Sequence, residues 1–221
     1  MSESKIGYLR SNELFRDLGD EGMKELDRVT AMSTCERGRV FYTPGETGEV
    51  LFLLKKGRVQ IYRLSPDGKK LILATLEPDT LFGEMALVGQ GMHNAFAEAL
   101  EPCMLCALSR NDVEWLLQKY PRVATRLVEI IGHRLMDAET RLEALAFKSI
   151  SARLAALLLA LQRDGFVQGR THQDLAEMIG TYRETATLTL NDFKTRGLIE
   201  IHRKKIEIRD QNALARIAET E

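Results

Sequence analysis

A glycine-containing stretch between residues 81 and 99 has the residue types of a cradle for a small charged molecule. Glu84 follows Gly83 at the end of a strand-like run and would supply a carboxylate. A cradle for an anion needs a cation at its far end, where the sequence has Asn94 and Ala95. His93 precedes them, and the pattern alone leaves open what this candidate effector pocket, with Gly83, Glu84, Asn94 and Ala95, would hold.

The three cysteines have side chains suited to thiol or soft-metal chemistry. Cys103 and Cys106 have the spacing of a redox or metal-binding pair. They fall in a strand-like run, however, where side chains three residues apart point to opposite faces. Small buried hydrophobes are the more typical role for such cysteines. A thiol switch or soft-metal site that also uses Cys35 stays open as an alternative, and no other metal site is predicted.

Arg183 and Glu184 could read base edges if a helix placed them in a DNA groove. Arginine forks onto guanine O6 and N7, and glutamate accepts a hydrogen bond from cytosine N4. A short helical pattern covers residues 171–180, a second covers 181–197, and an alternating segment around a basic tip follows at 198–210. This order predicts a winged helix-turn-helix whose second helix fits the major groove, about 12 Å wide.

The helix ends and the basic tip complete the predicted DNA surface. Thr171 and Thr181 are the predicted N-caps, although Thr181 and Glu184 also fit a capping box in which Glu184 serves its own helix. From residue 181 to 205, six cations stand against three anions. Cations and hydroxyls here suit phosphate contacts, which position a protein without reading sequence. The candidate DNA-binding residues are Thr171, Gln173, Thr181, Arg183, Glu184, Thr187, Leu188, His202, Arg203 and Lys204.

Apolar residues recur in steps of four and three along the segment that precedes this domain. The series runs from Ala124 to Leu145 and keeps a heptad seam over three repeats. A helix packed only on its own domain is the alternative, but three heptads favour a parallel homodimer. The predicted dimerisation residues are Val128, Ile131, Leu135, Ala138, Leu142 and Leu145.

The first half of the chain has a strand-like pattern. From residue 37 to 109, short apolar runs are separated by turn signals such as Pro44-Gly45 and Asp67-Gly68. This pattern is typical of a small antiparallel roll or barrel. We therefore predict an α+β protein with a β-roll sensor domain at 1–118, a dimerisation helix at 119–147 and a winged helix-turn-helix domain at 148–221.

The composition is that of an ordinary globular protein. The 221 residues are 44% hydrophobic and 29% charged, and the formal net charge is −1, so any basic surface must be local. The longest apolar run, residues 154–161, is far shorter than a membrane span. The first residues also lack the apolar region of a secretory signal. We expect a cytoplasmic protein with no membrane association.

Several short motifs are distinctive together: PGE at 44–46, FLLKKGRVQIY at 52–62, LFGEMAL at 81–87, RLEALAF at 141–147 and IGTYRETATLTL at 179–190. In these motifs and in the order of its parts, the chain resembles the cAMP receptor protein/fumarate-nitrate regulator (CRP/FNR) family of bacterial transcription factors. The resemblance covers nearly the whole chain and implies a cupin-like roll of the cyclic-nucleotide-binding type. It also implies a homodimer that binds pseudo-palindromic DNA and contacts RNA polymerase as a transcriptional activator. The sequence itself does not decide between activation and repression.

The resemblance also implies roles for single residues. Arg183 and Glu184 match the family's base-reading pair, whereas Leu188 stands where a second arginine often lies and could touch a thymine methyl. Glu84 matches the glutamate that holds the ribose of cyclic AMP, but Asn94 replaces the arginine that neutralises its phosphate, and Ala95 replaces a serine or threonine. An unpaired phosphate beside Glu84 would be costly in a partly dry pocket. We therefore expect neither cyclic AMP nor cyclic GMP as the effector.

Other sensing chemistries and other protein classes fit less well. An iron–sulfur sensor of this family needs four cysteines and this chain has three, while haem ligation would depend on the isolated His93 and His133. We expect no cofactor, and either an unknown small-molecule effector or none. A cupin-type metalloenzyme would need several ligands inside the roll, where His93 is the only histidine. A cyclic-nucleotide-binding module for a partner protein would not carry a winged helix. The chain is predicted not to be an enzyme.

Overall fold

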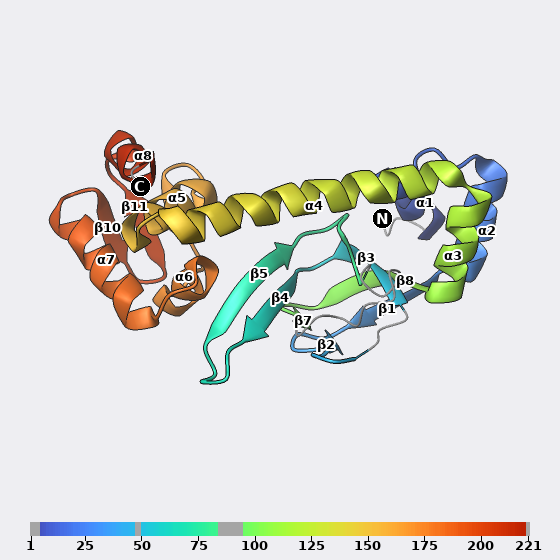
Figure 1. Ribbon diagram of the computed structural model, residues 1–221, viewed down its shortest axis with the longest axis horizontal. Coiled ribbons are helices and arrows are strands. Elements are labelled where there is room, and N and C mark those ends of the chain that lie inside the picture. The colour runs from blue at the N-terminus through green and yellow to red at the C-terminus, as the bar shows by residue number, and fades with distance from the viewer. Residues whose placement is uncertain (1–4, 47–49, 84–94, 220–221) are drawn as a thin grey trace. The chain divides into compact units, whose positions relative to one another are not determined.

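The computed structural model describes residues 5–46, 50–83 and 95–219 (Figure 1). It divides into two compact units, a roll unit (Met1–Arg63 with Leu73–Leu135) and a C-terminal unit (Leu64–Ile72 with Met136–Glu221). Helices and strands occur in both, as expected for the predicted α+β class. The elements are α1 (Lys5–Ser11), η1 (Glu13–Phe15), α2 (Asp20–Val29), β1 (Ala31–Cys35), β2 (Val40–Tyr42), β3 (Val50–Lys56), β4 (Val59–Leu64), β5 (Lys70–Leu76), β6 (Leu81–Phe82), β7 (Phe96–Ala99), β8 (Cys103–Ser109), α3 (Arg110–Lys119), α4 (Pro121–Phe147), α5 (Ile150–Leu161), β9 (Phe166–Gln168), α6 (His172–Ile179), α7 (Arg183–Thr195), β10 (Ile199–His202), β11 (Lys205–Ile208) and α8 (Gln211–Glu219).

Strands β1 to β8 form the predicted roll from two four-stranded sheets. One sheet has the order β1-β8-β3-β6 and the other the order β2-β7-β4-β5, so strands distant in the sequence lie side by side. Apolar side chains of both sheets share one core, in which the Phe52 and Phe82 rings stack with centroids 4.9 Å apart. Ring pairs of this kind add to the stabilisation that burial alone provides.

The helices α1, η1, α2 and α3 bury their apolar sides against the β1-β8-β3-β6 sheet. Leu9, Phe15 and Met23 of this layer are fully buried, in one cluster with Leu53 and Leu108 of the sheet. The strand pattern was predicted to begin at residue 37, but β1 already begins at Ala31. Because β1 is an edge strand and mostly exposed, its residues show no alternation that a sequence reading could detect.

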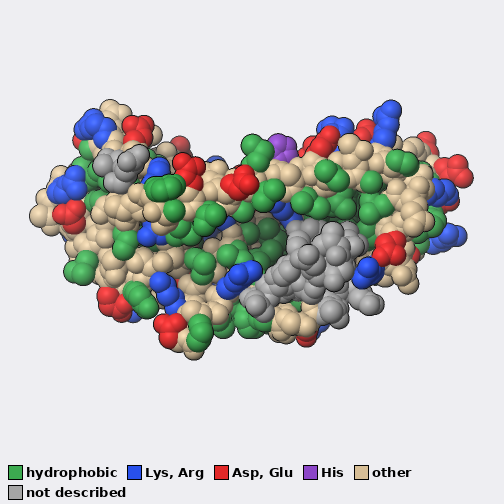
Figure 2. Space-filling model, in the orientation of Figure 1, with side chains coloured by type: hydrophobic (Ala, Val, Ile, Leu, Met, Phe, Trp, Pro, Cys, Tyr) green, Lys and Arg blue, Asp and Glu red, His purple; other side chains and the backbone are tan. Residues whose placement is uncertain are grey.

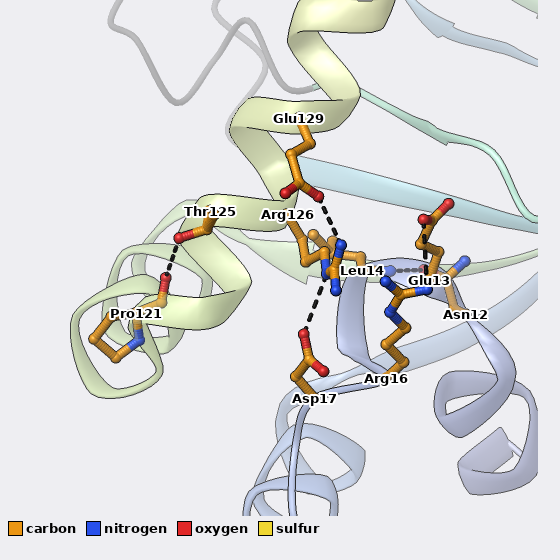
Figure 3. Close-up of polar contacts among 9 residues, drawn as sticks. All are labelled: Asn12, Glu13, Leu14, Arg16, Asp17, Pro121, Thr125, Arg126 and Glu129. Atoms are coloured by element: carbon orange, nitrogen blue, oxygen red, sulfur yellow. Dashed lines mark hydrogen bonds and ion pairs between the residues drawn. The ribbon is translucent and has the colours of Figure 1, made fainter.

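The start of α4 is held on the roll unit by a small polar network (Figure 3). Arg126 Nε lies 3.1 Å from Asp17 Oδ2, and Arg126 Nη1 lies 2.8 Å from Glu129 Oε2. On the same stretch of helix, Val123 and Leu127 are buried in the core under the helices. One side of α4 is therefore committed to its own unit at this end.

The C-terminal unit packs four helices around a small sheet. Its core combines Leu154 and Leu158 of α5, Leu175 of α6, and Leu190 and Phe193 of α7. The predicted two-stranded wing has a third strand, because β9 pairs with β11 in the sheet order β10-β11-β9. Helix α8 was likewise not predicted. Among the described residues, none of the helices has both the length and the hydropathy that a membrane crossing requires.

Candidate nucleic-acid interface and effector pocket

Helix α6 and the turn after it are built by local sequence signals. The Thr171 hydroxyl accepts a hydrogen bond from the Asp174 N–H at 3.1 Å, and the Asp174 carboxylate accepts one from the Thr171 N–H at 2.7 Å. This is a capping box, which satisfies two N–H groups that the helix leaves free. Gly180 ends the helix with φ 69°, a left-handed conformation that glycine adopts without strain. Both predicted ends of α6 are confirmed.

The prediction that Thr181 caps α7 is wrong. The N-cap is Tyr182, and the Thr181 N–H instead donates to the Ala176 carbonyl at 2.9 Å. The residue that follows a left-handed glycine closes the preceding helix, which moves the start of α7 by one residue. The capping box between Thr181 and Glu184 is wrong for the same reason. Thr181 is 7% exposed, which leaves it little surface for the predicted DNA contact.

One side of α7 is anchored in the core and the other is open. Ala186, Leu190 and Phe193 are buried. Arg183, Glu184 and Leu188 are exposed, and Leu188 has 71% of its surface accessible although it is apolar. The helix has 13 residues and is about 20 Å long, which suits insertion into a groove. The structure thus brings the three predicted base readers to one accessible surface.

His172 and Thr187 join the two helices of the motif. His172 Nδ1 lies 3.0 Å from Thr187 Oγ1, so the Thr187 hydroxyl is engaged inside the protein. Burial lowers the pKa of His172 from its usual 6.5, and the positive charge of Arg183 lowers it further. A neutral imidazole is therefore favoured here. We infer that Thr187 positions α7 against α6 through His172, a role that its sequence position alone did not indicate.

Several cations of the basic segment have partners inside the C-terminal unit. Lys194 Nζ lies 3.1 Å from Glu200 Oε1, and Arg196 Nη1 lies 3.2 Å from Asp192 Oδ2. Lys205 Nζ stands 3.4 Å from the centroid of the Phe166 ring, a cation–π contact. These three cations are less available to phosphates than their number in the sequence indicates.

The wing presents the remaining cations. The turn between β10 and β11 places Lys204 at φ 60°, and both Arg203 and Lys204 are exposed. In the part of the chain that the structure describes, no ion pair is found for Arg203, Lys204 or Arg183. His202 Nε2 lies 3.3 Å from Glu207 Oε2, and Gln173 Nε2 donates to Glu177 Oε1 at 2.7 Å. Arg203 and Lys204 are therefore the wing cations that remain exposed without an ion pair among the described residues.

The predicted seam of α4 is exposed along its length. Val128 is 68% exposed, Leu135 59% and Leu142 66%, and Ile131, Ala138 and Leu145 are exposed as well. Hydrophobic side chains are visible at the surface along α4 in Figure 2. Ala124, at the start of the series, is half-buried where the helix meets the roll unit. Contiguous exposed apolar surface of this kind is typical of an interaction site.

Two residues of the predicted effector pocket can be placed. Gly83 and Ala95 are both buried in the roll unit, while Glu84 and Asn94 lie outside the described residues. Arg134 of α4 donates a hydrogen bond to the Leu81 carbonyl, two residues before Gly83. The sequence reading missed Arg134 because its residue type fitted the charged flank of the heptad seam.

The cysteines lie on two different sides of one sheet. Cys35 of β1 stands directly opposite Cys103 of β8, and Cys103 is buried in the core between the sheets. Cys106 is buried in the other cluster, under the helices. The prediction that Cys103 and Cys106 face opposite ways is confirmed. Among the described residues, no group of three or more histidine, cysteine or acidic side chains is arranged to hold a metal ion.

Residues 33–120 match the family model of the cyclic nucleotide-binding domain, and residues 152–217 match that of the Crp-like helix-turn-helix domain. The chain is 34% identical over 218 residues to the cyclic AMP receptor protein of Thermus thermophilus, covering 95% of this chain and 98% of that protein. The chain belongs to the CRP/FNR family. As in that family, it is a DNA-binding transcriptional regulator and not an enzyme.

Two solved structures show how far this similarity extends. A CRP/FNR-family transcriptional regulator of T. thermophilus has a TM-score of 0.72 at 28% identity, covering 86% of this chain and 99% of that chain. The c-di-GMP-responsive global regulator of Xanthomonas campestris has a TM-score of 0.76 at 20% identity, covering 86% of this chain and 99% of that chain. The second likeness shows the shared fold. The Thermus thermophilus protein is named as a cyclic AMP receptor and the Xanthomonas campestris protein as c-di-GMP-responsive, so the two names give different nucleotides.

Proposed function

We propose that this CRP/FNR regulator acts as a homodimer on pseudo-palindromic DNA sites and does so without cyclic AMP. The observation that carries the proposal is the pairing of two surfaces on one chain, the open reading face of α7 and the exposed apolar seam of α4. The first needs a duplex to contact, and the second needs an apolar partner. A second copy of the chain supplies that partner and a second reading helix together.

The dimer is supported by the heptad spacing of the seam. Leu135 and Leu142 stand seven residues apart and are both mostly exposed, with Ala138 between them and Ile131 one turn before Leu135. In a parallel pair each of these positions meets its own counterpart, which is the arrangement of a two-stranded coiled coil. Two-fold symmetry of the protein would then match two half-sites about 34 Å apart on the DNA.

Independence from cyclic AMP is supported by the cassette that follows β6. The resemblance implies an arginine for the cyclic phosphate at position 94 and a hydroxyl at position 95, where this chain has asparagine and alanine. Asparagine carries no charge to balance the phosphate beside Glu84. Arg134 donates a hydrogen bond to the Leu81 carbonyl, so at least one of the guanidinium N–H donors of Arg134 is already used within the protein. The relatives carry different nucleotide names, so family membership leaves the effector open.

The test is DNA binding by the purified full-length protein, with and without cyclic AMP. A pseudo-palindromic fragment is first selected from random sequence by the ligand-free protein, and its affinity is then measured by fluorescence anisotropy. We expect the same dissociation constant with and without millimolar cyclic AMP. The matched variant Asn94→Arg with Ala95→Ser should gain cyclic AMP binding by calorimetry. A wild-type protein that binds DNA only with cyclic AMP would contradict the proposal.

RNA polymerase is proposed as a further partner. Transcription in vitro from a promoter that carries the selected site, with purified polymerase, measures this directly. A rise in transcript on addition of the regulator is expected for an activator, and a fall would identify a repressor.

A further inference from the structure

Cys35 and Cys103 are placed to be joined by a covalent bond. They are directly opposite one another in the antiparallel pair of β1 and β8. Opposed residues of such a pair have Cα atoms about 4.5–5.5 Å apart and side chains on the same face of the sheet. A disulfide requires a Cα separation of about 4.4–6.8 Å. The backbone therefore meets the requirement of a disulfide without a change of register.

The Cys103 thiol is held by the turn between β3 and β4. Its Sγ donates to the Glu101 carbonyl at 3.2 Å and is 3.5 Å from the Arg58 carbonyl. A Cβ on Gly57 would stand 2.7 Å from this sulfur and 2.6 Å from the Pro102 carbonyl oxygen, so only glycine leaves room for the thiol. The reduced thiol thus links the start of β8 to residues 57 and 58.

Cys35 is the accessible member of the pair. It is half-buried and lines a cavity of about 400 Å³ in the roll unit, together with Ser33, Thr34, Arg39 and Phe41. A cavity of this volume admits a small molecule. Arg39 is exposed, which adds a positive charge beside the cavity. Reagents from solvent therefore have a path to the Cys35 sulfur, whereas Cys103 is buried.

We propose that Cys35 and Cys103 form a reversible disulfide on reaction with hydrogen peroxide. The Cys35 sulfur attacks one peroxide oxygen, the O–O bond breaks, and a sulfenic acid and a first water are formed. The Cys103 sulfur then displaces the hydroxyl group from Cys35, which forms the S–S bond and releases a second water. Two thiols are oxidised and one peroxide is reduced, so no other reactant is required.

The order of the two steps follows from the surroundings of the sulfurs. Burial raises the pKa of the Cys103 thiol, and the neighbouring Cys35 raises it further, so Cys103 stays protonated near neutral pH. It is therefore a poor first nucleophile but a well-placed second one. Formation of the disulfide removes the thiol proton that Cys103 offers to the Arg58 and Glu101 carbonyls. Oxidation of the pair would release the turn at residues 57 and 58.

Cys106 offers a matched control. It is buried on the other side of the same sheet, in the cluster under the helices, and burial raises the pKa of its thiol as well. It has the reactivity expected of a buried cysteine but no cysteine opposite it, because its cross-strand neighbours are Met32 and Leu53. We expect it to take no part in the disulfide.

The experiment treats the reduced full-length protein with hydrogen peroxide and maps its peptides without reduction. An intramolecular link between the Cys35 and Cys103 peptides is expected in the wild type and in Cys106→Ser, and dithiothreitol should reverse it. The link should be lost in Cys35→Ser and in Cys103→Ser. In Cys103→Ser, dimedone should trap a sulfenic acid at Cys35. Circular dichroism checks that each variant folds. If Cys103→Ser does not fold, the comparison of the wild type with Cys35→Ser, a substitution at a half-buried position, decides the test.

A link through Cys106, a link between the Cys35 residues of two chains, or oxidation of the wild type without any disulfide would each overturn the proposal. The readout is a covalent bond and not DNA binding. Failure of this experiment would therefore leave the proposed function unaffected, and failure of the proposed function would leave this experiment unaffected.

Discussion

Shortening one leucine of the α4 seam should weaken self-association strongly. Leu135 is 59% exposed in the single chain, and a parallel dimer would bury both of its copies, one from each chain. Burial of a whole leucine side chain contributes about 1.5–3 kcal/mol, so the exposed part contributes about 1–2 kcal/mol per chain. The Leu135→Ala variant should therefore lose about 2–4 kcal/mol per dimer. At 1.4 kcal/mol for each factor of ten, the dimer dissociation constant rises roughly 30- to 700-fold.

Sedimentation equilibrium over a range of protein concentrations measures this change. The matched control is Met136→Ala, since Met136 is 63% exposed and adjacent to Leu135 but lies outside the heptad series. A substitution on an ordinary surface changes a free energy by about 0.5 kcal/mol or less per chain, so the two copies in a dimer should together alter the dissociation constant by about fivefold or less. Circular dichroism on both variants checks that α4 stays folded.

Three results would refute the reasoning. The first is a Leu135→Ala variant that dimerises as tightly as the wild type. The second is equal weakening by Met136→Ala, which would mean that a different face of α4 is in contact. The third is a wild-type protein that remains monomeric at the concentrations where it binds its DNA site.

The remaining predictions concern the DNA surface, a titration and a turn. Arg183→Ala should cost about 1–3 kcal/mol and relax the preference at one base position in a binding selection; an unchanged preference would remove Arg183 from the reading face. Lys204→Ala should weaken binding to all sequences alike and reduce the slope of log affinity against log salt by about one for each chain bound, and an effect confined to one sequence would contradict a phosphate contact. Burial and Arg183 hold the pKa of His172 below 6.5 in the folded state, so the unfolded state binds the proton more readily. Stability of the C-terminal unit should therefore fall as the pH drops below 6.5 and level off below the folded-state pKa, and His172→Gln should flatten this dependence in thermal melts at several pH values. Gly57→Ala should lower the melting temperature far more than Gly38→Ala, because both glycines have φ near 90° but only position 57 would press a Cβ against backbone and sulfur; equal shifts would show that the close contact costs nothing.

The helix-turn-helix was predictable because its signals are local. Thr171, Asp174 and Gly180 determine the ends of α6 through contacts within a few residues, and such contacts can be read from spacing. The error at Thr181 has the same origin. A threonine before a helix is a common N-cap, but here the left-handed turn at Gly180 takes up one more residue before α7 begins.

The missed elements depend on partners far away in the sequence. Strand β9 has three residues and exists because it pairs with β11, and the edge strand β1 exists because it pairs with β8. Short pieces of this kind carry too few residues for a periodic pattern. Register is also a long-range property, which is why the pairing of Cys35 with Cys103 needed the structure, although the opposite orientations of Cys103 and Cys106 followed from strand geometry alone.

The partners of the cations in residues 181–205 also could not be predicted from the sequence. These partners change the expected energetics of DNA binding. Six cations were counted there, but Lys194 and Arg196 have carboxylate partners and Lys205 has an aromatic one. The wing then offers Arg203 and Lys204, which gives four phosphate contacts in a dimer. The two wings should therefore contribute about −4 to the slope of log affinity against log salt concentration. A chain with a net charge of −1 adds little general attraction to this. Affinity for the correct site should therefore depend on base contacts by Arg183, Glu184 and Leu188 more than on the phosphate backbone, and a measured slope much steeper than −4 would show that other cations reach the DNA.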